Sequence, residues 1–474
     1  MKLLENINNL LWNNILIYLL LIIGIYFSIK TNLIQLRHFT YMFTILKNSY
    51  NTKTTGISSF QILCTTLAGR VGTGNLTGVA IALTTGGPGA IFWMWIISLI
   101  GMATSFVEST LAQLYKIKDQ HGYYRGGPAH YMKYGLNMPY MGIIFSICLI
   151  ISLGLIFNAV QANSIAQAMF VAFNFNPLHI GIILAILCAI IIFRNLYFII
   201  RVIEYIVPIM AITYLSLAFI VIINNIEKIP HILLLIVNNA FGLREATCGT
   251  IAYNISQTIM QGIERGLFSN EAGMGSSATL AATASPYPPH PISQGYIQMI
   301  SVFIDTIVIC TATSIIILSS GILENNIYHI SGIKLTQLSL ASTFGKYGIN
   351  FIAIAILFFA YTSIIANYIC AENSVLFLDK NHSLYIYILR LTTIIMIIVG
   401  SLIDMPIIWK LADICMGIMT LINLLAIIML SKTFLKLHND YNQQRKNGKL
   451  PIFNIQLFPE INKHFKKSVW KNYL

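Results

Sequence analysis

The first stretch of this chain that could bind a ligand is a polar, glycine-rich segment inside an apolar run. It places Gly69, Gly72 and Gly74 within six residues, around Arg70 and Asn75. Each glycine in a helix interior costs roughly 1 kcal/mol relative to alanine, so this spacing predicts a break in the helix. An unwound segment offers backbone carbonyls to a cation, and the N-terminus of the helix that follows offers amides to a carboxylate.

A second break of the same kind begins at Glu264 and ends near Ser276. Between them the chain reads Arg-Gly-Leu-Phe-Ser-Asn-Glu-Ala-Gly-Met-Gly, which puts a second acid at Glu271. Ionisable residues at membrane depth are candidates for function, because burying them in lipid is costly. Glu264 and Arg265 are neighbours, and they form either a structural ion pair or a gate.

Two simpler explanations of the glycines are weaker. A dinucleotide-binding loop needs a preceding β-strand and a third glycine at a fixed spacing, and Gly72-Thr73-Gly74 has neither. Close packing of helices would explain a single glycine. Two charged, glycine-rich breaks at matching positions favour a binding site over packing alone.

Other polar residues lie singly in apolar runs. Asn158 and Gln161 are three residues apart, so one face of a helix carries both. Each is either a substrate ligand or a hydrogen-bonding partner of a neighbouring helix. Glu108 and Asp305 are isolated acids that either carry protons or brace helices.

A pair of hydroxyl side chains stands at Thr362 and Ser363, inside another apolar run. In a helix such hydroxyls often bond back to their own backbone. They are also oxygen ligands of the kind that a hard cation takes. The sequence leaves both roles open for this pair.

Membrane-spanning helices are the elements that must position these residues. Hydrophobic residues make up 56% of the 474 residues and charged residues only 9%, whereas soluble domains carry about 25% charged residues. The apolar residues form runs of the length that crosses a bilayer, about 20 residues. The seven cysteines form no CxxC pair, which argues against a disulfide framework or a metal site. The composition therefore predicts an all-α polytopic membrane protein and excludes a soluble enzyme.

The apolar runs predict eleven transmembrane helices. The first lies in an extra N-terminal region, 1–57, and the other ten divide into two sets of five, at 58–224 and 248–431. Each set begins with a broken span, at 58–84 and at 248–280. Because five is odd, the two sets run in opposite directions, which is typical of an inverted-repeat transporter with its site at the breaks.

The distribution of basic residues predicts the orientation. The net charge is +13, and with the N-terminus outside, the inner segments hold 21 lysines and arginines and the outer segments six. This bias follows the positive-inside rule, so the basic tail at 432–474 is expected in the cytoplasm, partly disordered. The segment 30–55 mixes apolar and basic residues and could lie along the inner surface. No nucleic-acid motif accompanies the basic residues.

These motifs resemble the alanine/glycine:cation symporter family, also called sodium:alanine symporters, within the amino acid transporters that share a five-plus-five inverted repeat. The matching stretches are Gly69–Ala80, Gly86–Trp95, Tyr124–Pro128, Glu264–Ser276 and Phe303–Thr306. They run across the helical core, from about 55 to 430.

The resemblance implies a sodium-coupled importer of alanine or glycine in the inner membrane of the cell, with no other cofactor and with protons sometimes serving as the coupling ion. It implies a substrate site formed by Thr73, Gly74, Asn75, Gln161, Ser269, Asn270, Glu271, Gly273 and Met274. It implies a cation site formed by Ala68, Val71, Asn75, Thr362 and Ser363.

One position departs from the family pattern. Family members carry a tryptophan a few residues after the hydroxyl pair, and this chain has Asn367 there. An asparagine would enlarge and polarise that side of the pocket, so the hypothesis extends the substrate to a more polar amino acid such as glutamine.

Two rival functions stay open, namely a proton-coupled amino acid transporter and a passive channel for small polar solutes. A membrane-embedded enzyme is not expected, because the apolar runs offer no paired metal ligands and no nucleophile beside a base.

Overall fold

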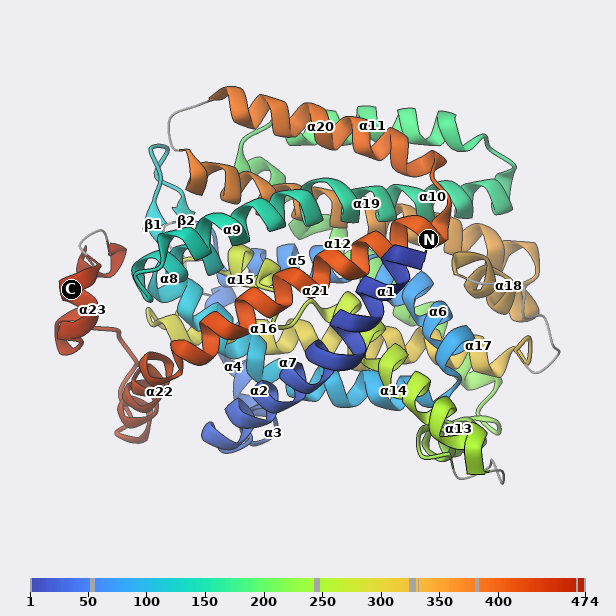
Figure 1. Cartoon of the computed structure of the whole chain (residues 1–474), viewed down its shortest axis with the longest axis horizontal. Helices are drawn as coiled ribbons and strands as arrows, with labels where there is room; N and C mark the ends of the chain where they lie inside the picture. Colours follow the sequence, from blue (N-terminus) through green and yellow to red (C-terminus); the bar gives the residue numbers. More distant parts are fainter. Residues whose placement is uncertain are drawn as a thin grey trace.

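A computed structural model describes most of the chain. The described residues are 2–51, 56–242, 248–323, 330, 332–379, 383–465 and 468–472. Five basic residues behind the charge distribution, at 53, 244, 380, 466 and 467, lie outside them. The described part is an all-α bundle (Figure 1), as the composition predicts.

The N-terminal region forms one long helical rod followed by two helices. It comprises α1 (Lys2–Leu11), the π-helical turn η1 (Trp12–Leu16), α2 (Ile17–Lys30), α3 (Ile34–Arg37) and α4 (Phe39–Asn51). The helices α3 and α4 occupy the segment expected along the membrane surface.

The first set of five spans begins with a helix interrupted at residues 71–73. The elements in order are α5 (Ser59–Arg70), η2 (Gly74–Gly78), α6 (Val79–Gly86), α7 (Gly89–Leu114), α8 (Pro128–Tyr134), α9 (Pro139–Leu149), η3 (Ile150–Phe157), α10 (Asn158–Phe173), α11 (Pro177–Ile192) and α12 (Leu196–Asn224). A short hairpin joins α7 to α8, and its strands are β1 (Ile117–Lys118) and β2 (Tyr124–Arg125).

The second set also begins with an interrupted helix. Its elements are α14 (Cys248–Asn270), α15 (Ser276–Ala281), α16 (Pro291–Val302), η4 (Phe303–Cys310), α17 (Thr311–Ser319), α19 (Lys346–Leu378), α20 (Ser383–Leu402) and α21 (Met405–Met429). Two further helices lie in connections, α13 (Ile229–Ala240) and α18 (Ile333–Phe344).

Among the described residues, seven helical stretches are long and apolar enough to cross a bilayer. They are Gly89–Leu114, Pro139–Phe173, Leu196–Asn224, Pro291–Ser319, Lys346–Leu378, Leu384–Leu402 and Met405–Met429. Three shorter apolar helices include α2 and α11. The helices α5 and α6 fall below this threshold because the break shortens them, whereas α14 is 23 residues long and is too polar. The total of eleven spans and the inverted repeat stay predictions.

The helices form two packed groups that enclose the breaks. One group contains α10, α11, α19 and α20, and the other contains α7, α14 and α16. Figure 1 shows the first group along one side of the bundle and the second along the other. The helix α5 packs against α19 of the first group and α16 of the second, so its broken end lies in the interior.

The C-terminal tail is folded where the structure describes it, so its expected partial disorder is wrong for those residues. It contains α22 (Ser431–Lys446), η5 (Ile455–Leu457), α23 (Pro459–His464) and η6 (Val469–Asn472). Trp470 is fully buried and donates a hydrogen bond of 3.0 Å to the carbonyl of Gln113. Isolated aromatic anchors hold this segment, and they leave no helical periodicity in the sequence. Figure 1 shows the tail at the same end of the bundle as the β1–β2 hairpin.

Candidate functional site

The first break opens the backbone between α5 and η2. Val71 leaves the helix with a ψ of 86°. The amide of Gly72 donates 3.0 Å to the side-chain oxygen of Asn75, and the amide of Thr73 donates 3.1 Å to Gln161 Oε1. These bonds replace helical bonds that the break removes, as a buried backbone requires.

The second break is a tight turn with three left-handed residues. Glu271, Gly273 and Gly275 have φ values of 52°, 87° and 88°. Glycine adopts this conformation readily, whereas it is strained for Glu271, and such strain gathers at functional sites. The Glu271 carboxylate accepts a hydrogen bond of 2.5 Å from Ser276 Oγ, at the start of α15.

Asp305 joins the two breaks. Asn75 Nδ2 donates 2.7 Å to Asp305 Oδ1, and Ser269 Oγ donates 2.8 Å to Asp305 Oδ2. The breaks also touch directly, because a Cβ on Gly74 would lie 2.9 Å from the Cα of Ser269. Glycine at position 74 therefore permits the contact, and the predicted residues Gly74, Asn75 and Ser269 lie together.

Arg70 is a connecting residue to which the sequence analysis assigned no role. Its side chain is buried and donates 2.8 Å to Ser277 Oγ of α15 and 3.0 Å to Ser105 Oγ of α7. It also bonds the carbonyl of Gln298 and the hydroxyl of Ser301, both on α16. Its place inside the first glycine motif was the available signal, because a charged residue at a break needs buried partners.

Acidic groups outnumber the base in this region. Arg70 interacts electrostatically with Asp305, Glu271 and Glu108, and all four side chains are buried. Three buried carboxylates thus lie within electrostatic range of one guanidinium, and uncompensated buried charge is costly. The arrangement therefore favours binding of a cation or of protons.

Glu108 holds the second break in place. Its carboxylate accepts hydrogen bonds from the amide of Gly273 at 3.3 Å, from Asn423 Nδ2 at 2.8 Å and from Ser277 Oγ at 3.3 Å. Asn423 also donates 2.9 Å to the carbonyl of Gly273. Asn423 was not predicted from the sequence, although a polar side chain within an apolar span was an available signal. These contacts support the bracing role for Glu108 and leave a proton-carrying role open.

The predicted cation ligands are brought together only in part. Ser363 Oγ lies 2.7 Å from the carbonyl of Ala68 and 3.5 Å from that of Val71. Both hydroxyls also lie 3.0 Å from carbonyls of their own helix, but Thr362 Oγ1 has the sulfur of Met210 on α12 as its other neighbour, at 3.8 Å. Asn75 belongs to the Asp305 contacts. The hydroxyls of Thr362 and Ser363 therefore face different neighbours.

Gln161 and Asn158 have different partners. Gln161 reaches the first break, and a Cβ on Gly72 would lie 2.9 Å from its Oε1. Asn158 bonds the carbonyl of Gly154 on its own helix and accepts 3.1 Å from Asn367 Nδ2 across to α19. The first residue thus lies at the predicted site, whereas the second links two helices beside it.

Several polar atoms at the breaks are buried without a hydrogen-bond partner in the described part of the chain; besides guanidinium nitrogens of Arg70 and Arg265, they include Thr73 Oγ1 and Asn270 Nδ2. Asn270 uses only its Oδ1, which accepts 3.0 Å from the amide of Ala272. Met274 is fully buried beside them in sequence. Because buried polar groups are normally bonded, these two atoms are suited to a small polar ligand.

An ion pair closes the other face of the second broken helix. Arg265 lies 2.6 Å from Asp413 of α21 and 3.0 Å from Glu264, and the three side chains are buried. Phe268 packs against Trp409 in a tilted arrangement, with ring centroids 4.5 Å apart. A cavity of about 310 Å³ is lined by Glu264, Arg265, Trp409 and Asp413 among others.

Known proteins resemble this chain along nearly its whole length. The sequence pattern of the sodium:alanine symporter family matches residues 1–455. This chain belongs to the sodium:alanine symporter family. Membership makes it a multi-pass membrane transporter of amino acids and confirms the resemblance drawn from the motifs.

Individual relatives within the family cover most of the chain. The uncharacterized transporter YaaJ of Escherichia coli is 45% identical over 98% of this chain and 97% of its own. The probable sodium/glutamine symporter GlnT of Bacillus subtilis is 46% identical over 94% of this chain and 91% of its own. The sodium/proton-dependent alanine carrier protein of Bacillus sp. PS3 is 34% identical over 88% of this chain and 95% of its own.

A solved structure supports the fold alone. The manganese transporter of Eremococcus coleocola superposes with a TM-score of 0.51 and covers 86% of this chain and 84% of its own, at 12% sequence identity. At that identity the likeness says nothing about the transported substrate.

Proposed function

We propose that this chain imports a small neutral amino acid together with sodium across the inner membrane, with its N-terminus outside and its C-terminus in the cytoplasm. The observation that carries the proposal is the pair of facing breaks joined by Asp305, with Thr73 Oγ1 and Asn270 Nδ2 left for a ligand. A zwitterion has complementary groups for such a site.

The substrate carboxylate binds the amides and hydroxyl of the first break, around Thr73 and Gly74. The substrate ammonium group binds near the second break, where Glu271 supplies a carboxylate. Helix ends of opposite polarity at one place suit a molecule with both charges. Gln161, Gly273 and Met274 complete the walls.

Sodium binds where Ser363 meets the carbonyls of Ala68 and Val71. Hard cations prefer oxygen ligands of this kind. A sodium ion in this site fixes the end of α5 against α19. The first break then already has the conformation that binds the amino acid. Because Thr362 faces α12, it is not part of this arrangement.

The transport cycle is alternating access. In the outward-facing state the Arg265–Asp413 pair separates and the substrate enters past Phe268 and Trp409. In the inward-facing state the opposite ends of α5 and α15 move apart from the surrounding helices. The two interrupted helices thus serve as the moving elements.

The substrate class includes glutamine as well as alanine and glycine. Asn367 lies on α19 beside the site and donates to Asn158, so this wall is polar where family members carry tryptophan. A relative that is 46% identical to this chain is named as a probable sodium/glutamine symporter, which supports glutamine as a substrate.

Proton coupling is the second candidate. The excess of buried carboxylates around Arg70 favours it, because protons neutralise such a cluster as well as sodium does. Glu108 and Glu271 would be the groups that carry them.

Uptake by purified protein in liposomes tests these functions together. Labelled alanine, glycine and glutamine are supplied under an inward sodium gradient, an inward proton gradient or no gradient. Accumulation that requires the sodium gradient is the expected result. Accumulation driven by the proton gradient alone would identify protons, and not sodium, as the coupling ion. Uptake that continues unchanged without any gradient would identify a channel.

A further inference from the structure

The hairpin between α7 and α8 carries a motif that the proposed site does not use. The motif is Tyr124-Arg125-Gly126-Gly127-Pro128, at the end of the bundle where the tail lies. Arg125 is buried in spite of this position, with 5% of its surface exposed. A buried charge far from the binding site requires an explanation of its own.

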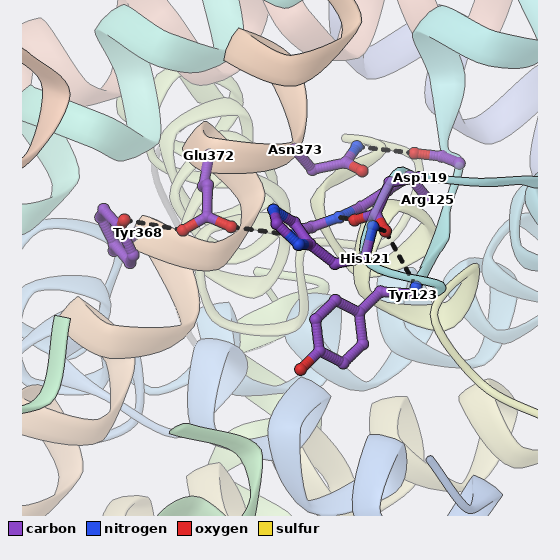
Figure 2. Close-up of polar contacts among 8 residues, drawn as sticks. Asp119, His121, Tyr123, Arg125, Tyr368, Glu372 and Asn373 are labelled. Atoms are coloured by element: carbon purple, nitrogen blue, oxygen red, sulfur yellow. Dashed lines mark hydrogen bonds and ion pairs between the residues drawn. The ribbon is translucent and has the colours of Figure 1, made fainter. Parts of the chain in front are cut away.

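Arg125 connects the hairpin to α19. Its NH2 group lies 2.9 Å from Glu372 Oε1, and its Nε lies 3.0 Å from Asp119 Oδ2 within the hairpin. The other oxygen of Glu372 accepts 2.7 Å from the hydroxyl of Tyr368, which in turn accepts 2.9 Å from Arg390 of α20. Figure 2 shows Arg125 between Asp119 and Glu372, with Tyr368 on the far side of Glu372.

The backbone beside Arg125 reinforces the same connection. Asn373 Nδ2 donates 2.7 Å to the carbonyl of Gly126 (Figure 2). Glu372 and Asn373 follow Ser363 on α19 by nine and ten residues. At 1.5 Å per residue they lie about 14 Å further along the helix, at the end of the bundle where the hairpin lies (Figure 1). The contacts of the hairpin with α19 therefore lie between the binding site and this end of the bundle.

The two glycines of the motif press the hairpin against the second broken helix. A Cβ on Gly126 would lie 2.6 Å from the Cβ of Ala282, and one on Gly127 would lie 3.0 Å from the Cα of Thr279. Gly127 also has a φ of 112°, which few other residues adopt. The hairpin thus holds α15 and α19 at once.

A cavity lies beside the Arg125–Glu372 ion pair and provides space for the two side chains to separate. It has a volume of about 260 Å³ and is lined by Arg125, Lys133, Asn373 and Phe377 among others. One guanidinium nitrogen of Arg125, NH1, is buried without a partner in the described residues. Separating a buried ion pair is costly unless water reaches both charges. Here water can enter from this cavity as the hairpin moves.

We infer that Arg125 is a positioning residue that holds the cytoplasmic side of the transporter closed, and that its bond to Glu372 breaks each time the site opens inward. The inference rests on the proposed alternating access. Opening requires α15 and α19 to separate at this end, and the hairpin spans both. Removing the pair therefore shifts the population toward the inward-facing state, because only the closed state contains it.

Amide hydrogen exchange of the protein in lipid nanodiscs tests this inference. Arg125→Gln is compared with the wild type, and Lys118→Gln serves as a matched control, because Lys118 is an exposed base on the same hairpin. In Arg125→Gln, exchange at 276–290 is expected to speed up at least about fivefold. Exchange at 256–266, on α14 at the outer side of the second break, should stay unchanged or slow down. Lys118→Gln should match the wild type in both segments.

A second variant separates a gating role from simple loosening. The conservative variant Arg125→Lys keeps a positive charge between Asp119 and Glu372, and it should return exchange at 276–290 toward the wild-type rate. Unchanged exchange in Arg125→Gln would overturn the inference, as would equal acceleration in both segments or exchange in Arg125→Lys as fast as in Arg125→Gln. If Arg125→Gln does not fold, Glu372→Gln replaces it with the same expectations. Uptake is measured on the same preparations, so absence of transport by the wild type would overturn the proposed function separately.

Discussion

Asn75 and Ser269, which are 194 residues apart in the sequence, donate hydrogen bonds to opposite oxygens of one carboxylate, that of Asp305. Each comes from a different interrupted helix. The carboxylate therefore fixes the distance between the two breaks and with it the width of the candidate site.

Replacing Asp305 by asparagine should abolish most of the transport. The carboxylate accepts from Asn75, Ser269 and Thr306, and an amide cannot accept at its nitrogen. At least one buried donor loses its partner, at a cost of about 1–3 kcal/mol. We expect initial uptake in liposomes to fall at least about tenfold.

A control for this variant is Asp404→Asn, because Asp404 is exposed and its side chain caps no helix amide. It should transport like the wild type. Normal uptake by Asp305→Asn would show that transport does not require the hydrogen bonds by which the Asp305 carboxylate connects the two breaks.

Removing the hydroxyl of Ser363 should weaken sodium binding. Ser363 Oγ lies against the carbonyls of Ala68 and Val71, whereas Thr362 faces Met210. Loss of one oxygen ligand, worth about 1–1.5 kcal/mol, should raise the half-saturating sodium concentration of Ser363→Ala by about tenfold. The neighbouring variant Thr362→Val should leave it within about twofold. A larger effect at Thr362 than at Ser363 would place the ion on the other face of α19.

Shortening Asn367 should change which amino acids compete. Asn367 faces Asn158 from the next helix at 3.1 Å, and together they supply amide groups near the site. In Asn367→Ala, glutamine should compete with alanine uptake about fivefold less well, because one hydrogen bond is worth about 1 kcal/mol. Alanine uptake itself should persist. Equal inhibition by glutamine in variant and wild type would remove Asn367 from substrate selection.

The contact between the tail and the surface helices should weaken in acid. Burial, followed by the charges of Arg445 and Arg37, lowers the pKa of His38 from 6.5 to about 4. Its neutral ring accepts 2.9 Å from Arg445 NH2 and bonds Tyr296 at 2.8 Å. When the tail is detached, His38 has the higher pKa and binds a proton more readily. The docked tail is therefore most stable above pH 6.5, and its stability falls as the pH drops from 6.5 toward 4.

Limited proteolysis of the tail between pH 7 and pH 4.5 measures this effect. Cleavage within 431–446 should increase on acidification in the wild type. His38→Gln keeps a polar side chain without the titration, so its cleavage should vary less with pH. The same increase in both proteins would assign the effect to other groups, such as His438, whose pKa burial also lowers to about 4.

The membrane class and the two breaks follow from the sequence alone. Apolar runs of spanning length and the cost of glycine in a helix are local properties, so 69–75 and 264–276 are recognisable without any neighbour. The family motifs are local in the same sense. They place Gly74, Asn75 and Ser269 at the site before any contact between them is known.

Only the tertiary structure decides which of these residues meet. Adjacent residues on a helix point about 100° apart, and packing alone determines that Ser363 faces the first break while Thr362 faces α12. Arg125 and Glu372 pair across 247 residues, and the tail docks through single aromatic anchors such as Trp470. Contacts of this kind arise from how whole helices pack, and no local pattern encodes them.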